Sequence, residues 1–279
     1  KGVDLVVRDL ARRTDMNFGN VATHGWQDRG ALLAMIIDAD NRAGNGVQLY
    51  DAASGVLRVL ESDTAEYTGL TWRKRSADLA VMRVVKDEKY EEPTHTLIAW
   101  RGLGTPRSTT LRLDPANRAG FPAAHRIVET REPRWSEDGN TIFFGIREWT
   151  EKPGRPVAAA GDSANGGARP VQPEKKEEPA GVEVWHAADV DIVPEQKVRA
   201  NMDRNRNMLT AWHLNGDRVV RLALDLREDV TLSDGRMAVV LDGRAYDQDR
   251  MFGPIYRDIA ALDISTGERI PVARRVQHQ

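Results

Sequence analysis

The sequence predicts an all-β protein, a β-propeller of four-stranded antiparallel blades arranged as a complete or partial ring. Three observations support this prediction: strand-like segments that repeat, turn motifs between them, and short strands that are apolar on both faces. A period of about 40–45 residues with four strands per unit is typical of propellers. We therefore expect residues 1–279 to form a single propeller region.

The repeat is clearest in three segments, each with a strand that runs into an Asp, a later Trp and then an apolar strand. The Asp residues are Asp9, Asp51 and Asp114, the Trp residues are Trp26, Trp72 and Trp135, and the apolar strands cover 31–37, 79–85 and 142–146. The first two Asp residues are 42 positions apart and the first two Trp residues 46, whereas the next interval is 63 for both. The spacing between successive Asp residues and the spacing between successive Trp residues therefore increase together along the chain.

Two fainter copies follow. Residues 209–216 lead to a turn at 232–235 and a strand at 237–241. Residues 259–267, which contain Asp263 and end in Ser-Thr-Gly, match 49–55 almost position for position. We expect four to five structural units in all.

Each part of the repeat has a physical role. Asp-Gly, Asn-Gly and Asp-x-x-Ser/Thr-Gly favour hairpin turns, because Gly adopts positive φ and Asp or Asn side chains accept from nearby backbone amides. The strands at 79–85 and 142–146 are apolar at consecutive positions, which indicates burial on both faces, as in stacked blades. The recurring Trp is large enough to pack between neighbouring sheets.

A helical interpretation competes at the start of the chain. Val3, Val6, Val7 and Leu10 fit the i, i+3, i+4, i+7 spacing of an amphipathic helix. The same residues also fit the strand register of the repeat, which we prefer.

Residues 150–181 break the pattern, because Pro, Gly, Ala and charged residues predominate there. Such a segment buries too little apolar surface to offset the entropy of ordering. We predict a flexible insertion between two strands of one blade, with strand character resuming at 182–185. A solvated loop is favoured over a functional lid.

Composition excludes several classes of function. The 40 basic and 42 acidic residues give a net charge of −2, so no global field favours nucleic acid or anionic membranes. There is no cysteine, which excludes disulfides, thiolate metal sites and a cysteine nucleophile. No apolar run approaches the roughly 20 residues of a membrane helix. The start at Lys1 has neither an initiator Met nor a signal peptide, so we expect a fragment or a processed chain.

No catalytic, cofactor-binding or metal-binding motif is present. The six histidines, His24, His95, His125, His186, His213 and His278, form neither H-x-H nor H-E-x-x-H. We expect His186 and His213, each after a Trp, to be structural or partly exposed strand histidines. The catalytic, cofactor and metal assignments are therefore none.

Other motifs fail on spacing. The segment from Asp203 lacks the Gly and Glu of a calcium loop. Asp38-Ala39-Asp40 and Asp247-Gln248-Asp249 are better interpreted as turn carboxylates. Ser163 lies in the insertion and outside any G-x-S-x-G, and Gly102-Leu103-Gly104 lacks the third glycine of a dinucleotide site. The 42 acidic residues single out no carboxylate pair for glycoside hydrolysis.

Residues 135–139, Trp-Ser-Glu-Asp-Gly, resemble the W-S-P-D-G turn of TolB-like proteins and of the prolyl oligopeptidase family of serine peptidases. Segments 182–197, 203–214 and 251–258 look like the propeller of large bacterial members of that family. The resemblance covers most of the chain, although 72–78 lacks the Pro-Asp-Gly turn and 26–30 has it only loosely.

The resemblance implies a propeller that gates and docks peptide substrates for an α/β-hydrolase domain in the same polypeptide, outside this chain. In that family the Ser-Asp-His triad lies C-terminal to the propeller, so no catalytic residue is carried over here. Enzyme activity would belong to the parent peptidase, and a periplasmic or secreted location is favoured. We expect no nucleic-acid partner and no membrane span.

Two alternatives remain. The chain could be a stand-alone TolB-like propeller that binds proteins without catalysis. It could also be an enzyme whose carboxylates meet in a central channel, as in propeller glycosidases.

Overall fold

The computed structural model describes residues 1–152, 198, 200, 202–233, 235–249 and 253–277. These residues form four antiparallel sheets, here called blades 1 to 4 in chain order. Blade 1 contains β1 (Val3–Asp9), β2 (Thr14–Trp26), β3 (Leu32–Ile37), β4 (Gly46–Asp51) and β5 (Val56–Ser62). Blade 2 contains β6 (Tyr67–Trp72), β7 (Leu79–Val85), β8 (Thr94–Arg101) and β9 (Thr109–Leu113).

Blade 3 contains β10 (His125–Val128), β11 (Arg134–Trp135), β12 (Thr141–Glu148), β13 (Met208–His213) and β14 (Arg218–Arg221). Blade 4 contains β15 (Asp229–Leu232), β16 (Met237–Asp242), β17 (Tyr256–Asp263) and β18 (Arg269–Gln277). Three single-turn 3₁₀ helices lie in connections: η1 (Asp40–Arg42), η2 (Pro115–Asn117) and η3 (Arg244–Tyr246).

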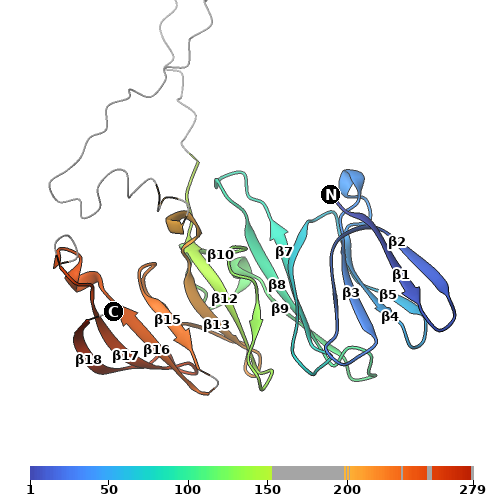
Figure 1. Ribbon diagram of the computed structural model, residues 1–279. Coiled ribbons are helices and arrows are strands. Elements are labelled where there is room, and N and C mark those ends of the chain that lie inside the picture. Colours follow the sequence, from blue (N-terminus) through green and yellow to red (C-terminus); the bar gives the residue numbers. More distant parts are fainter. Residues whose placement is uncertain (153–197, 199, 201, 234, 250–252, 278–279) are drawn as a thin grey trace, which may run out of the picture.

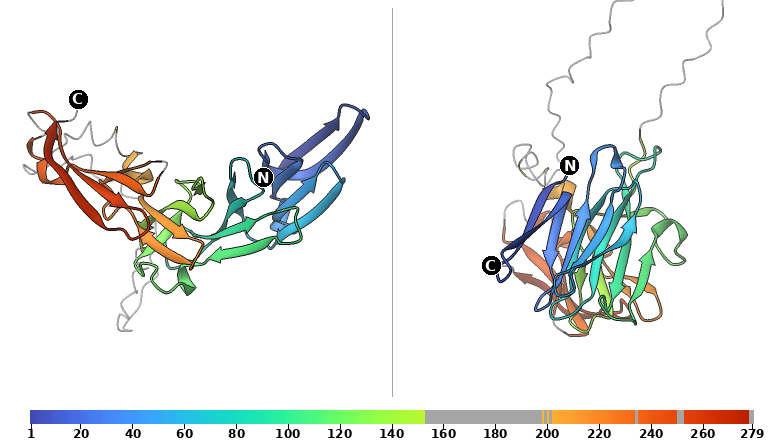
Figure 2. Two further views of the ribbon diagram at one scale, coloured as in Figure 1. Left: turned by 90° about the horizontal axis from the view of Figure 1, so that it is seen from below. Right: turned by 90° about the vertical axis from the view of Figure 1, so that its right-hand side faces the viewer.

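Within each blade the strands follow the chain as a meander, so each strand pairs with the next one in sequence. Blades 2 and 4 have the expected four strands. Blade 1 has a fifth because β1 is added to its edge, and the first strand of blade 3 is split into β10 and β11, which both pair with β12. The four sheets stand side by side in a curved, open row, with blades 1 and 4 at its ends (Figures 1 and 2). The expected β-propeller architecture is confirmed, as an arc of four blades.

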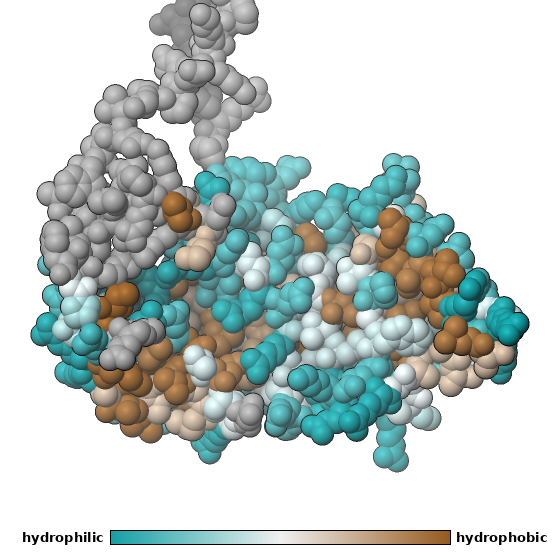
Figure 3. All heavy atoms as spheres, viewed as in Figure 1, coloured by the Kyte–Doolittle hydropathy of each residue, from teal (hydrophilic) through white to brown (hydrophobic). Residues whose placement is uncertain are grey.

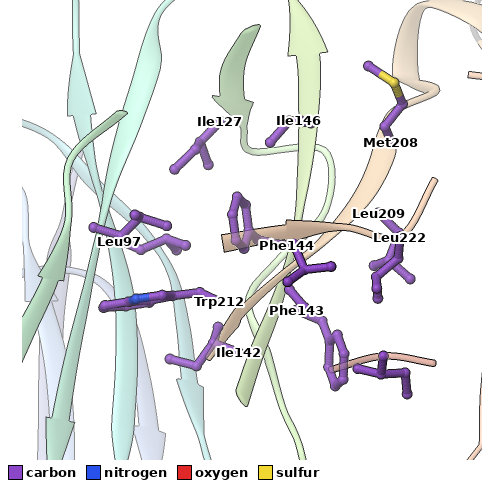
Figure 4. Packing of buried hydrophobic residues seen from close by; sticks show 14 of the residues in the cluster. Leu97, Ile127, Ile142, Phe143, Phe144, Ile146, Met208, Leu209, Trp212 and Leu222 are labelled. Atoms are coloured by element: carbon purple, nitrogen blue, oxygen red, sulfur yellow. The ribbon is translucent and has the colours of Figure 1, made fainter. Parts of the chain in front are cut away.

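The core lies between the blades. One cluster joins blades 1 and 2, and a larger one runs from blade 2 through blade 3 to blade 4. In blade 2 alternate residues serve the two clusters: Leu79 and Val81 face blade 1, whereas Ala80 and Met82 face blade 3. Trp212 of β13 is fully buried in the larger cluster, near Ile142 (Figure 4). Strands that are apolar at every position are therefore buried on both faces, as expected.

The recurring Trp holds the same position in successive blades. Trp26 and Trp72 end the first strand of their blade's four-stranded meander, and Trp135 ends the split first strand of blade 3. Trp72 Nε1 donates to the carbonyl of Gly25 at 2.8 Å, and Trp135 Nε1 donates to that of Thr71 at 3.3 Å. Each acceptor directly precedes the Trp of the preceding blade. The recurring Trp residues therefore occupy equivalent structural positions, and their indole hydrogen bonds connect neighbouring blades.

The prediction that Asp9, Asp51 and Asp114 are structurally equivalent is wrong. Asp9 ends β1, Asp51 ends β4, the third strand of the meander, and Asp114 follows β9, the fourth strand of its blade. Asp recurs in all three places because each precedes a turn that needs a side-chain acceptor. The equivalence of Asp51 with Asp263 is correct, since both end the third strand of a meander.

The start of the chain is a strand, so the helical alternative for Val3 to Leu10 is wrong. β1 pairs only with the first half of β2, and the second half of β2 pairs with β3. Between the halves, Asn20 adopts a positive φ of 59°. This bend separates the β1–β2 hairpin from the rest of blade 1.

The predicted insertion at 150–181 lies almost entirely outside the described residues, as do 182–185. Its two ends leave neighbouring strands, because β12 and β13 pair from Thr141–His213 to Ile146–Met208. In the part of the chain that the structure describes, no helix has the length and hydropathy needed to cross a bilayer.

Candidate functional site at the loop end

The described parts of the connections between the second and third strands of all four meanders lie at one end of the molecule, upper in Figure 1, which we call the loop end. They are the segments 38–45, 86–93, 149–207 and 243–255. The opposite end carries tighter turns, such as 136–140, where Asp138 accepts from Ser136 Oγ at 2.6 Å and from the Asn140 amide at 3.0 Å. Binding residues concentrate in longer loops held by a rigid scaffold. The loop end is therefore the candidate functional face.

A pocket of about 440 Å³ opens between blades 3 and 4 at this end. Its volume lies within the range of small-molecule and short-peptide sites. The lining combines apolar, basic, amide and acidic side chains: Arg131, Met202, Asn205, Arg206, Asn207, Leu209, Ala223, Leu226, Glu228, Asp229 and Val230.

On the blade 3 side, the guanidinium of Arg131 is hydrogen-bonded to the side-chain amide of Asn207. Arg131 Nε donates to Asn207 Oδ1 at 2.6 Å, and Asn207 Nδ2 donates to the Asn205 carbonyl at 3.0 Å. Gly145 of β12 makes this arrangement possible, because a Cβ there would lie 2.5 Å from Asn207 Oδ1 and 3.0 Å from the Arg131 Cβ. Among the described residues, the Asn207 amide is the only hydrogen-bond acceptor of the Arg131 guanidinium.

On the blade 4 side, Glu228 is buried and fully engaged. Its carboxylate accepts from Arg269 at 2.8 and 2.9 Å, from Arg244 at 3.0 Å and from the Leu224 amide at 2.8 Å. Burial alone would raise the pKa of Glu228, but the hydrogen bonds from Arg269 and Leu224 and the two positive charges outweigh it and lower that pKa. This carboxylate is structural.

Arg244 joins two more carboxylates to the same network. It donates to Asp242 at 2.7 Å and to Asp225 at 3.0 Å, and hydrogen bonding to Arg244 lowers the pKa of Asp242. A glycosidase needs one carboxyl group with a raised pKa to act as the acid. The acidic residues gathered here are ion-paired and have lowered pKa values, so this cluster does not supply that acid.

The described lining of the pocket contains no hydroxyl, thiol or imidazole group. Of the Arg131 guanidinium, only Nε has a hydrogen-bond acceptor among the described residues, and a guanidinium beside apolar side chains can bind a carboxylate or a peptide group reversibly.

Of the histidines considered in the sequence, His95 and His213 are described and lie outside the pocket. His95 is buried, with Nδ1 2.9 Å from the Ile127 carbonyl. His213 is half-buried between Thr141 Oγ1 at 3.0 Å and the Ile264 carbonyl at 3.1 Å, which agrees with the expectation of a strand histidine. His186, His278 and Ser163 lie outside the described residues.

The turn carboxylates also behave as expected. Asp38 accepts from Asn45 Nδ2 at 3.2 Å, and Asp247 pairs with Arg227 at 2.6 Å. Gly102 and Gly104 have positive φ in the turn between β8 and β9. Among the described residues, no group of three His, Cys, Asp or Glu side chains could hold a metal ion.

Sequence reasoning missed the pocket residues Arg131, Asn207 and Glu228, which come from three different connections. The one signal in the sequence was Gly145, a glycine within an apolar strand, which commonly marks a close approach of other groups.

Comparison with solved structures finds similarities at low sequence identity. It is similar to the β-propeller domain of the Trilobed protease from Pyrococcus furiosus, with 9% identity, a TM-score of 0.41, and coverage of 96% of this chain and 61% of that one. It is also similar to the acylaminoacyl peptidase of Pyrococcus horikoshii (11% identity, TM-score 0.40, 93% and 33% coverage) and to TolB from Acinetobacter baumannii (12%, 0.32, 98% and 54%).

At these scores the fold is established by the four sheets of this chain itself. The chain spans less than two thirds of each of these three proteins, and about one third of the acylaminoacyl peptidase. No protein-family model and no curated protein sequence matches it.

Proposed function

We propose that this chain is the propeller region of a serine peptidase of the prolyl oligopeptidase type, and that its loop end docks and gates peptide substrates for an α/β-hydrolase domain. The observation that carries the proposal is the pocket between blades 3 and 4. Its lining combines apolar side chains with Arg131, which is hydrogen-bonded to Asn207. The Trp135–Gly139 turn, which resembles the turn of that family, supports it further.

The pocket has the chemistry of peptide docking. A peptide presents amide groups, apolar side chains and carboxylates. The pocket lining offers hydrogen-bond donors, the apolar side chains of Leu209, Leu226 and Val230, and a guanidinium. Because Glu228 is paired with Arg244 and Arg269, and Asp229 with Arg257, both carboxylates of the lining are ion-paired and their repulsion of an anionic peptide end is reduced.

Docking is tested with a filling substitution. Leu226→Trp places a large ring in the pocket, and Leu57→Trp makes the same change at an exposed site on blade 1. Fluorescence anisotropy of labelled five-residue peptides should show at least tenfold weaker binding for Leu226→Trp and wild-type binding for Leu57→Trp. Equal binding by both variants would refute docking in this pocket.

Membership in a peptidase is tested on the full-length gene product. A fluorophosphonate probe should label one serine outside residues 1–279, and labelling should block peptide hydrolysis. Absence of labelling, combined with peptide binding that depends on Leu226, would instead support the alternative of a stand-alone TolB-like binding propeller.

A further inference from the structure

Three turns lie together beneath blades 1 and 2, at the end of the molecule opposite the loop end, here called the turn end. They connect β2 with β3 (27–31), β6 with β7 (73–78) and β8 with β9 (102–108). A hydrogen bond joins the first turn to the second, from Gln27 Nε2 to the Ser76 carbonyl at 3.0 Å. Another joins the second to the third, from the Gly102 amide to the Asp78 carboxylate at 2.8 Å. The three turns therefore form one continuous surface.

This surface carries an excess of positive charge, and we call it the basic surface. Its exposed basic side chains are Arg29, Lys74, Arg75 and Arg107. Among the residues that the structure describes, none of these four forms an ion pair. Of the two carboxylates in the same turns, Asp78 is 5% exposed and paired with Arg73, and Asp28 accepts from the Arg75 amide at 3.1 Å. Hydrophilic side chains gather along the lower edge of the molecule, where the turns of blade 2 lie (Figure 3).

Arg29 and Arg75 have a backbone conformation that suits arginine poorly, with positive φ of 59° and 54°. In blades 1, 2 and 3 the amide that follows the recurring Trp closes the turn on a carbonyl five residues later: Gln27 to Leu32, Arg73 to Asp78 and Ser136 to Thr141. In the third of these turns the residue with positive φ is Gly139. Gly, Asn and Asp adopt positive φ at lower cost than a long side chain does. The turn itself therefore does not require arginine at 29 or 75.

Two arginines at the loop end provide a contrast. Arg42 and Arg275 also have positive φ, but Arg42 is ion-paired with Glu66, and Arg275 with Asp249 at 3.2 Å. Their guanidinium groups have partners within the fold, whereas those of Arg29 and Arg75 have no carboxylate partner among the described residues. An unfavourable backbone conformation that no internal contact explains points to a function of the side chain.

We propose that the basic surface binds an acidic segment of another protein, with Arg29 and Arg75 as its main contacts. A planar guanidinium matches the two oxygens of a carboxylate and can donate to both. A single exposed ion pair contributes little, so several carboxylates have to bind together. Four basic side chains on three joined turns provide such a set.

The other residues of the three turns favour a protein over other anions. None of them is aromatic, whereas proteins that bind single-stranded nucleic acid stack its bases on aromatic side chains. Their one large aliphatic residue, Leu103, is 5% exposed, so the turns offer no large apolar side chain for insertion into a lipid surface.

The test uses the full-length gene product, so that any part of the polypeptide that covers the basic surface is present. Fluorescence anisotropy follows a labelled peptide in which Glu alternates with Ser, and the same peptide with Gln in place of Glu. Wild type should bind only the Glu peptide, and added salt should weaken that binding because exposed ion pairs are screened. Arg29→Asn combined with Arg75→Asn should weaken it about fivefold or more. This variant should melt no lower than wild type, since Asn tolerates positive φ.

Three variants serve as controls. Arg42→Asn combined with Arg275→Asn removes the same charge from residues of the same conformation, and it should bind the Glu peptide as wild type does. Arg29→Lys combined with Arg75→Lys keeps the charge and should retain most of the binding. Leu226→Trp fills the pocket between blades 3 and 4 and should leave this binding unchanged, which separates the basic surface from the proposed peptide docking.

Four results would overturn the proposal. Absence of binding by the full-length protein would show that the basic surface takes no acidic segment. Equal binding by wild type and the Arg29 and Arg75 double Asn variant would exclude these two residues. An equal loss in the Arg42 and Arg275 variant would reduce the effect to net charge. Tighter binding of a single-stranded oligonucleotide or of anionic lipid vesicles than of the Glu peptide would identify a different partner.

A second pair of substitutions keeps the test decisive. If circular dichroism shows that the Arg29 and Arg75 double Asn variant does not fold, Lys74→Gln combined with Arg107→Gln removes two charges from the same surface at residues that do not have positive φ. The same weakening of Glu-peptide binding is expected, and wild-type binding by this variant would contradict the proposal.

Discussion

Asp51 and Asp263 perform the same task in the first and last blades of the row. Asp51 accepts from the Ala53 amide at 3.0 Å and from Ser54 Oγ at 2.7 Å, and Asp263 accepts from the Ser265 amide at 2.8 Å and from Ser265 Oγ at 2.6 Å. Each turn then closes on a glycine with positive φ, 73° at Gly55 and 79° at Gly267. The shared motif therefore encodes one hairpin geometry at both ends of the molecule.

Removing these carboxylates should destabilise the two turns unequally. Asp263 also pairs with Arg236, at 2.8 Å from its Nε, whereas Asp51 has only the turn contacts among the described hydrogen bonds. We expect Asp263→Ala to lower the melting temperature more than Asp51→Ala. Differential scanning calorimetry measures both, and Asp263→Asn, which keeps the turn acceptor, should fall between wild type and Asp263→Ala.

Trp212 should be the costliest of the tryptophans to truncate. It is fully buried and its Nε1 donates to Asp217 at 2.8 Å. Trp212→Ala should cost about 3–5 kcal/mol in the free energy of unfolding, as for large aromatic residues in cores. Trp26, which is 46% exposed, is the matched control and should cost about 1 kcal/mol or less. Urea unfolding gives both values, and equal costs would contradict the packing described.

Glu228 should make stability depend on acid pH. Its pKa is lowered in the folded state by Arg269, the Leu224 amide and Arg244, despite its burial. Between its ordinary value of 4.5 and the lowered value, the unfolded chain binds more protons than the folded one. This stabilisation is therefore complete above pH 4.5 and is lost as the pH falls through the folded-state pKa. Urea unfolding from pH 6 to 3 should show a shallower loss for Glu228→Gln than for wild type.

His95 should make the stability of the fold depend on pH at higher pH values than Glu228 does. Burial lowers its pKa below the ordinary 6.5, against the smaller effect of its bond to the Ile127 carbonyl. The unfolded chain therefore takes up the proton first, and stability should decline as the pH falls below 6.5 towards the folded-state pKa. NMR titration of the imidazole should show this lowered pKa, and His95→Gln should make the decline between pH 6.5 and 5 shallower, with His125 and His213 accounting for part of the remainder because their pKa values are also lowered by burial.

Gly145→Ala should damage the pocket and the fold together. The new methyl group would lie 2.5 Å from Asn207 Oδ1, so Asn207 and Arg131 must shift, at a cost of about 1–3 kcal/mol. Gly235→Ala is the control, because the nearest atom to its Cβ lies 3.9 Å away. Thermal unfolding and peptide anisotropy should both change for Gly145→Ala and neither for Gly235→Ala.

The sequence was sufficient for the architecture because every blade repeats one local pattern. Trp72 and Trp135 could be aligned since each donates a hydrogen bond to the backbone of the preceding blade, a constraint shared by the junction of blades 1 and 2 and that of blades 2 and 3. Asp9, Asp51 and Asp114 misled because a turn acceptor is useful after any strand, whatever its rank in the sheet.

The pocket and the bend in β2 could not be predicted in the same way. Arg131, Asn207 and Glu228 meet only through the packing of blades 3 and 4, and no fixed spacing connects them. The bend in β2 accompanies the positive φ of Asn20 and a register shift between Val21 and Thr23, neither of which can be recognised in a pattern of apolar residues.

The pairing of β12 with β13 has a consequence for how fast the molecule folds. Ile146 and Met208 are cross-strand partners, yet 62 positions separate them in the chain, whereas the other strand pairs of blade 3 are joined by much shorter connections. Closing a long loop before its contacts can form slows folding, because its entropy is lost first.

Blade 3 should therefore be the last to assemble, with blades 1 and 2 already folded beside it. Replacing 149–206 by a four-residue turn would shorten the loop by about four halvings, worth roughly 2 kcal/mol in loop-closure entropy. The acceleration of refolding would then report how much of the barrier is set by this one connection.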